Sequence, residues 1–226
     1  MITIDFHIHS WFSFDSLTKP HQILREARSK GLNGVAVTDH ETIQGGIATA
    51  LLNKDPNFLV VVGAEYSTEA GDLIGLFLQE EITSRDPLAV IREIHQQDGL
   101  ALLPHPFHGH RLDPKILEKV DIIESFNARE TPENNQKALE LARKWNKPVL
   151  CGSDAHLSQD IGTCRMAFST TDIKTELVRN GAQLTTGYTP RYRTSVSQII
   201  KSVKLRRYHT IPYQTVRLLK RLLVQS

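Results

Sequence analysis

The stretch ITIDFHIHS, residues 2–10, joins an apolar, β-branched run to two histidines that are separated by one residue. Such a run is typical of a buried β-strand. Residues i and i+2 of a strand point to the same face, so we expect the imidazoles of His7 and His9 to converge on one point. A carboxylate, Asp15, follows shortly after. The first strand therefore ends in a group of candidate metal ligands.

Further apolar runs follow, and amphipathic helical segments such as HQILREARSKG and DPLAVIREIHQQDG lie between several of them. The runs are GVAVTDH (34–40), FLVVVGAE (58–65), LIGLFL (73–78), LALLPHP (100–106), DIIESFN (121–127), PVLCGSDAH (148–156) and, before a last helix that starts near Thr171 or Asp172 and stops at Gly181, IGTCRMAFS (161–169). This alternation predicts an α/β fold with parallel pairing, either a barrel or a doubly wound sheet, and about seven strands favour the barrel.

Length and composition are those of an ordinary globular protein with one main domain. The chain has 226 residues, of which 40% are hydrophobic and 23% are charged. No run approaches the roughly 18 apolar residues of a membrane span, and the N-terminus lacks a basic segment leading into an apolar one, so we expect a cytoplasmic protein. We expect Cys151 and Cys164 to be buried and not to form a disulfide.

The charge is distributed unevenly along the chain. Residues 177–226 contain ten Lys and Arg and no Asp or Glu, whereas the remainder contains 17 basic and 25 acidic residues. We assign residues 1–188 to a catalytic barrel and residues 189–226 to a basic extension with two amphipathic helices. Their apolar faces could pack on the barrel, or their basic faces could attract nucleic acid; contact with an anionic membrane surface is a less favoured third interpretation.

Polar side chains stand at the carboxyl ends of six of the apolar runs. Because the carboxyl ends of parallel strands gather at one edge of an α/β fold, these residues are candidates for one site. A single histidine at a strand end is usually structural, but imidazoles and carboxylates at six ends indicate a cluster of Zn, Mn or Fe ions. The residues are His7, His9, Asp39, His40, Glu65, His105, Asn127, Asp154 and His156.

The motifs HIHS, FSFDS, AVTDHETIQGG, VGAE, LLPHP, ESFN and GSDAH, in this order, resemble the polymerase and histidinol phosphatase (PHP) family. The resemblance runs from residue 2 to about residue 187, and it is strongest to the small stand-alone phosphoesterases of the family. It implies a distorted (β/α)7 barrel with up to three divalent ions at the carboxyl ends of its strands.

The resemblance also implies a ligand set. One metal would take His7, His9, Glu65 and Asp154; a second would share Glu65 and add His105; a third would use Asp15, His40 and His156. Asn127 departs from the family pattern, in which His or Cys is common at this position. An amide oxygen is a poorer transition-metal ligand than imidazole, so either the second site prefers Mn or Mg, or the protein uses two ions.

The chemistry expected of such a cluster is hydrolysis of a phosphate ester. Two ions about 3.5 to 4 Å apart convert a bridging water into hydroxide for in-line attack. Of the ligands, we expect Glu65, Asp154 and His156 to be catalytic. Arg129 is the first candidate to bind the phosphate, because guanidinium forms a bidentate fork. Arg111 and His108, in the loop FHGHRLD, are further candidates for substrate binding, and His110 shares that loop.

We therefore expect a metal-dependent phosphoesterase that acts on a phosphomonoester or a small nucleotide. One alternative is an exonuclease that trims oligonucleotides, with the basic extension guiding the polyanion. Another is a non-catalytic, metal-stabilised docking module that uses the extension as its binding surface. An amidohydrolase could also use such a cluster, but the order of the motifs fits it less well. The sequence assigns no oligomeric state.

Overall fold

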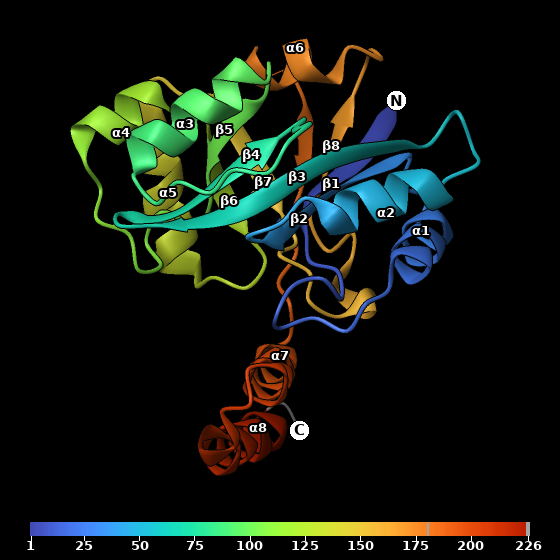
Figure 1. The fold of residues 1–226 in the computed structure, drawn as a ribbon, viewed down its shortest axis with the longest axis vertical. Coiled ribbons are helices and arrows are strands. Elements are labelled where there is room, and N and C mark those ends of the chain that lie inside the picture. The colour runs from blue at the N-terminus through green and yellow to red at the C-terminus, as the bar shows by residue number, and fades with distance from the viewer. Residues whose placement is uncertain (180, 225–226) are drawn as a thin grey trace.

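The computed structural model describes residues 1–179 and 181–224. These residues form a sheet of nine strands that curls into a nearly closed barrel, with helices packed outside it (Figure 1). The strands are β1 (Ile2–Ile8), β2 (Gly34–His40), β3 (Leu59–Thr68), β4 (Gly71–Leu76), β5 (Leu100–Leu103), β6 (Ile122–Asn127), β7 (Val149–Gly152), β8 (Arg165–Phe168) and β9 (Gln183–Thr185).

The strands lie in the order β7-β6-β5-β4-β3-β2-β1-β8-β9. The barrel approaches closure where β7 meets β1, through a single parallel bridge between Ile8 and Ala155. There the amide of His9 donates to the carbonyl of Ala155 at 2.9 Å, and the amide of Ala155 donates to the carbonyl of His7 at 3.1 Å. The two ends of the ligand-bearing sequence are therefore neighbours across this seam.

The α/β class is confirmed, but the sheet departs from seven parallel β/α units. β4 is antiparallel to both β3 and β5, and β8 and β9 are antiparallel to their neighbours. The reason for the first departure is the link between β3 and β4, which consists of Glu69 and Ala70 only. Two residues suffice for a hairpin, whereas a parallel crossover needs a dozen or more.

The helices follow capping signals that are plain in the sequence. Helices α1, α3, α4 and α5 each begin with proline at the first position, where its missing N–H costs nothing, and Asp86, Asp113 and Thr131 cap the last three with their side chains. The helices are α1 (Pro20–Ser29), α2 (Gln44–Leu52), α3 (Pro87–Gln96), α4 (Pro114–Lys119), α5 (Pro132–Lys144), α6 (Ile173–Val178), α7 (Arg191–Lys204) and α8 (Ile211–Val224).

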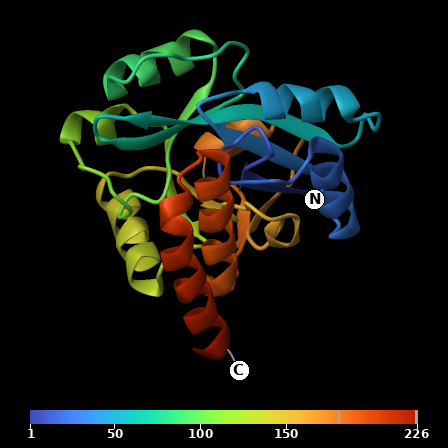
Figure 2. The same cartoon turned by 60° about the horizontal axis from the view of Figure 1, so that its bottom comes forward.

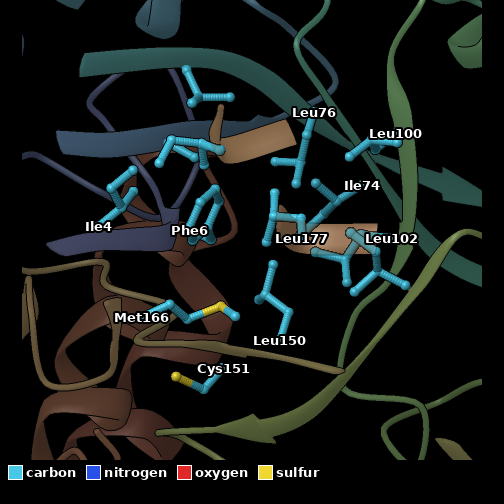
Figure 3. Close-up of a cluster of buried hydrophobic side chains, with 14 of the residues drawn as sticks. Ile4, Phe6, Ile74, Leu76, Leu100, Leu102, Leu150, Cys151, Met166 and Leu177 are labelled. Atoms are coloured by element: carbon cyan, nitrogen blue, oxygen red, sulfur yellow. The ribbon is translucent and has the colours of Figure 1, made fainter. Parts of the chain in front are cut away.

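An apolar core fills the interior of the barrel beneath the site. Figure 3 shows Ile4 and Phe6 of β1 close to Ile74, Leu76 and other side chains from across the sheet. Burying such side chains contributes about 1.5–3 kcal/mol each relative to exposure. Cys151 and Cys164 both lie in this core as buried free thiols and form no disulfide. The core fixes the strands whose ends carry the polar cluster.

Helices α7 and α8 form a hairpin that lies outside the barrel, below it in Figure 1 and in front of it in Figure 2. Arg193 on α7 pairs with Asp160 at 2.6 Å, which fixes the start of the hairpin to the barrel. The apolar face of α7 does not face the barrel mouth; Thr194, Gln198 and Lys201 do. None of the helices in residues 1–179 and 181–224 is long and apolar enough to cross a membrane.

Candidate metal centre

His7 and His9 meet at the centre of the site, as the spacing of the first strand predicts. Their Nε2 atoms lie 3.1 Å apart, and both rings are fully buried. The Nε2 atom of His9 is 3.4 Å from a carboxylate oxygen of Glu65 and 3.4 Å from one of Asp154. Two imidazole nitrogens and two carboxylates thus face a common point.

A bulge in β1 turns His7 toward this point. The pairing of β1 with β2 shifts by one residue between Asp5 and Ile8. Phe6 packs inside the barrel, yet the side chain of Ile8 packs outside it under α1, so the alternation is broken between them. Bulges commonly re-aim side chains next to active sites. Phe6 can therefore fill the core while the adjacent His7 faces the barrel mouth.

A second group of ligands lies beside the first. Asp15 is 3.3 Å from His40 and 3.1 Å from His156, measured from its Oδ2 to their Nε2 atoms. The Nδ1 atom of His40 is 3.2 Å from Glu65, which therefore contacts both groups. The other oxygen of Asp15, Oδ1, is buried and lacks a hydrogen-bond partner among the described residues.

The donors present fit divalent metal ions. Within each of four sets, the candidate ligand atoms lie within 4.8 Å of one another. The donors are imidazole and carboxylate, which suit Zn, Mn and Fe, and the unpaired buried oxygen of Asp15 is the kind of atom that a cation would satisfy. The sets are His9, Asp15, His40 and His156; His7, His9 and Glu65; His7, His105 and Asp154; and Asp72, His105 and His110.

Glu124 is a central residue of the site that the motif analysis did not assign. It accepts a hydrogen bond from His7 Nδ1 at 3.0 Å, from the amide of His105 at 2.8 Å and from the side chain of Asn127 at 2.9 Å. A carboxylate behind a ligating histidine fixes its tautomer and raises its basicity. The available signal was a carboxylate inside the apolar strand DIIESFN.

Asp39 and Ser13 play the same part for His9. The Oγ atom of Ser13 is 3.1 Å from His9 Nδ1 and donates to Asp39 at 2.7 Å. Asp39 also accepts hydrogen bonds from the amide and the hydroxyl of Ser10, both at 2.6 Å. The sequence places Asp39 at a strand end, and the structure shows that it orients a ligand from behind.

Three buried carboxylates of the site, Glu65, Asp154 and Asp15, have a pKa below the usual range. Burial by itself would raise the pKa of each, but the neighbouring imidazoles hold the pKa of Glu65 well below its usual range. The guanidinium of Arg129 and the imidazole of His7 do the same for Asp154, and His156 and His40 lower the pKa of Asp15. These side chains therefore present negative charge to a cation at neutral pH.

The buried histidines of the site differ in the direction in which their pKa is shifted. Burial would lower the pKa of His105, but its hydrogen bond to Glu65 and the charge of that carboxylate raise it to about 9. The pKa of His156 also rises to about 9 through Asp15, although burial and a neighbouring guanidinium act in the opposite direction. Burial and the nearby imidazoles lower the pKa of His9 to about 3. Metal binding must displace the protons that the first two carry.

The β5–β6 side of the site is poorer in ligands. His105 Nε2 lies 3.0 Å from Glu65. Asn127 reaches the site, but its amide nitrogen donates to Glu124 and Asp154, and its oxygen accepts the backbone amide of Arg129 at 2.9 Å. Asn127 is thus placed as a hydrogen-bond partner of the ligands, with its amide oxygen already engaged.

Arg129 lies in the site and Arg111 does not. The Nη1 atom of Arg129 is 3.3 Å from Asp154 and also contacts the ring of His156. Arg111 is exposed and lines a separate hollow, and its backbone amide donates to the carbonyl of Ala70 at 2.9 Å. Arg111 does not line the cavity of the candidate ligands, and its role in substrate binding stays a prediction. His108 is at the rim, with Nδ1 2.8 Å from Glu130.

The ligands line an open cavity of about 200 Å³ at the barrel mouth. Helix α7 contributes one wall of it. The lining residues are Asp15, His40, Glu65, Asp72, His105, His108, Arg129, Glu130, Asp154, His156, Thr194, Gln198 and Lys201.

Comparison with known families identifies the fold. The PHP domain model matches residues 5–144, and a PHP-associated model matches residues 132–180. Residues 181–226 lie outside both matches.

The chain is also similar in sequence to known proteins. The chain is 40% identical to an uncharacterized protein of Methanocaldococcus jannaschii over 138 residues, which are 55% of this chain and 81% of that protein. It is 27% identical to a probable histidinol-phosphatase of Thermotoga maritima over 205 residues, with 70% of this chain and 86% of that protein covered.

Among solved structures, the fold is similar to that of a two-domain protein from Bacteroides vulgatus that contains a predicted PHP-like metal-dependent phosphoesterase. The TM-score is 0.68 at 18% identity, and 82% of this chain is covered. This chain spans 65% of the length of that protein.

Proposed function

This chain belongs to the PHP domain family, and we propose that it hydrolyses a small phosphate monoester with two or three divalent metal ions as cofactors. The observation that carries this proposal is the convergence of imidazoles and carboxylates from separate strand ends on one cavity that also holds Arg129. Divalent ions in such a site polarise phosphoryl oxygens and lower the pKa of water.

The candidate ligands form two sets of donors that would hold the ions. His7, His9 and Glu65 form one set of donors, and Asp154 completes it through its contacts with both histidines. Asp15, His40 and His156 form the other set with His9, while Glu65 touches both. Because Glu65 contacts both sets and His156 contacts Asp154 of the other set at 3.2 Å, we propose Glu65, Asp154 and His156 as the catalytic ligands.

Arg129 is placed to hold a phosphoryl oxygen. Its guanidinium is largely buried in the cavity wall beside Asp154 and His156, and guanidinium matches the geometry of phosphate. An anionic substrate would replace the partial charge neutralisation that Asp154 now provides. Arg129 therefore fixes the orientation of the ester relative to the ligands.

His108 is the candidate proton donor to the leaving alcohol. Its hydrogen bond to Glu130 raises its pKa, although burial acts in the opposite direction. Because Nδ1 faces Glu130, Nε2 is the nitrogen that can donate at the rim of the cavity. A proton at this atom would neutralise the alkoxide as it departs.

The cavity size supports a small substrate. Its volume of about 200 Å³ is below the roughly 300–1,000 Å³ that is usual for drug-sized ligands. The basic hairpin of α7 and α8 is the feature that keeps the oligonucleotide-trimming alternative open. Neutralising several phosphates makes affinity fall steeply with salt, so a KM that is insensitive to salt favours the monoester.

The test is phosphate release by metal-stripped protein reconstituted with Mn, Zn, Fe or Mg. The panel contains histidinol phosphate, nucleoside mono- and bisphosphates and short oligonucleotides, with His7→Ala beside the wild type. Turnover that requires metal and disappears in His7→Ala supports the proposal. Tight metal binding without turnover of any compound contradicts it and favours the docking module.

A further inference from the structure

Helix α7 presents a polar stripe to the metal ligands. Thr194, Gln198 and Lys201 are spaced by four and three residues, which puts them on one face of a helix. All three line the cavity that Asp15, His40 and the other ligands line. The stripe lies in the part of the chain that neither family match covers, so the family assigns it no role.

Two further contacts hold α7 in this position. The Nη2 atom of Arg129 donates to the hydroxyl of Ser197 at 2.9 Å, which joins the middle of α7 to the cavity wall. Near its end, the ammonium of Lys204 donates to three backbone carbonyls of residues 11–16, at distances of 2.5 to 3.1 Å. That loop carries Asp15. The helix is therefore tied to two elements of the site.

Lys201 is a cation without an anionic partner in this stripe. Its Nζ lies 4.5 Å from the centroid of the Phe14 ring, and that ring stacks on His40 at 4.4 Å with an interplanar angle of 6°. Within residues 1–179 and 181–224, Lys201 forms no ion pair, and its side chain is half-buried. The aromatic ring holds the ammonium beside the ligands without neutralising it.

We propose that Lys201 binds a phosphoryl oxygen of the substrate, so that the basic extension supplies part of the substrate site. This rests on the proposed phosphate-ester substrate. Lysine acts on phosphate as a point charge with three donors, which complements the planar fork of Arg129. Thr194 and Gln198, with a hydroxyl and an amide, are placed on the same wall to contact the alcohol part of the ester.

The experiment compares Lys201→Met, Lys201→Arg and Lys220→Met in the full-length, metal-loaded protein. Lys220 is an exposed lysine on α8, so its replacement removes the same charge from the hairpin but outside the cavity. The measurements are kcat and KM for the preferred ester, the Kd of inorganic phosphate by calorimetry, and the bound metal by elemental analysis.

We expect Lys201→Met to raise KM and the Kd of phosphate by about tenfold or more, because a charge-assisted hydrogen bond is lost. In Lys201→Met, we expect the amount of bound metal to stay unchanged and kcat to change less than KM. Lys201→Arg should recover most of the affinity for phosphate. KM and the Kd of phosphate in Lys220→Met should stay within about twofold of wild type. If Lys201→Met and Lys220→Met have equal KM and Kd while the wild type turns over, Lys201 does not bind the phosphate and the proposed function stands.

The Kd of inorganic phosphate also tests whether Lys201 binds phosphate when no ester is hydrolysed. In that case the proposed function fails, yet a weaker Kd of phosphate in Lys201→Met alone still supports the anion site. Wild-type protein that carries its metal but does not bind phosphate overturns the inference.

Discussion

The two sides of the metal centre differ in the number of candidate donor atoms that they provide. On the β1 side, His9, Asp15, His40 and His156 bring four donor atoms within 4.8 Å of one another. On the β5–β6 side, Asn127 provides an amide instead of an imidazole, and this amide is bound to neighbouring residues. Donor number sets affinity, so the difference predicts tight loading of the β1 side and weaker loading of the β5–β6 side.

The strongest test of this asymmetry is His9→Ala. His9 belongs to two of the donor sets, and its loss removes a neutral, fully buried imidazole from both. We expect activity to fall by about three orders of magnitude or more, because the charge stabilisation that the ions supply is lost. Metal content by elemental analysis should fall as well. An active, fully metallated His9→Ala protein would show that the β1 side is not the principal site.

The pH dependence of metal affinity reports how many protons the histidines on each side of the metal centre release when metal binds. His156 on the β1 side and His105 on the β5–β6 side both have a pKa raised to about 9. Their protonation stabilises the metal-free fold fully below pH 6.5, and this stability is lost as pH rises through about 9. Metal must displace these protons and those of His7 and His40, whose pKa values are also raised, so affinity should rise by about a hundredfold or more per pH unit between pH 7 and 8.5 when both sides load.

Calorimetry in buffers of different ionisation enthalpy measures the proton count directly. His105→Ala should release about one proton fewer than wild type at pH 7.5 if the β5–β6 side binds an ion. An unchanged count would mean that only the β1 side is loaded.

Glu124→Gln distinguishes the effect of ligand orientation on metal affinity from the effect of the number of ligands. Gln keeps the shape of Glu124 but removes the charge that His7 Nδ1 and the amide of His105 face. We expect metal affinity to fall about 10- to 100-fold, which is the usual cost of losing such a carboxylate, with the same final stoichiometry. Competition with a fluorescent chelator measures this. A loss of stoichiometry instead would assign Glu124 as a direct ligand.

Asn127→His supplies the side chain that the β5–β6 side lacks. We expect affinity for the most weakly held ion to rise about tenfold, because imidazole is a better ligand than amide for Zn, Mn or Fe. The gain is limited by the loss of the hydrogen bonds that Asn127 makes to Glu124 and Asp154. Stepwise titration with Zn measures the affinity of the last ion to bind. An unchanged affinity in this last step would show that donor number does not limit metal binding on the β5–β6 side.

The ligands could be predicted from the sequence because they follow strands that are recognisable as apolar runs. His7, His40, Glu65, His105 and Asp154 were identified in this way, and the structure brings them together. Their convergence was predictable because parallel strands gather their carboxyl ends at one edge regardless of the details of packing, and their role as metal ligands stays a prediction.

The remaining features of the fold and the site could not be predicted from the sequence, because they depend on departures from the regular periodicity of strands and helices. A bulge in β6 brings Glu124 to the same site as Asn127 although the two residues have opposite parity, and a strict period of two does not reveal Glu124. The hairpin of β3 and β4 arises because β3 continues past Glu65 to Thr68. The polar stripe of α7 was obscured because amphipathic helices usually turn their apolar side inward.

The seam between β1 and β7 sets an order of events during synthesis of the protein. His7 and His9 leave the ribosome about 150 residues before Asp154 and His156, which join them only through the bridge of Ile8 to Ala155. At roughly 5–20 residues per second, His7 and His9 wait on the order of ten seconds for these partners. A nascent chain thus holds an incomplete chelator, and full metal loading is reserved for a chain whose barrel has come together.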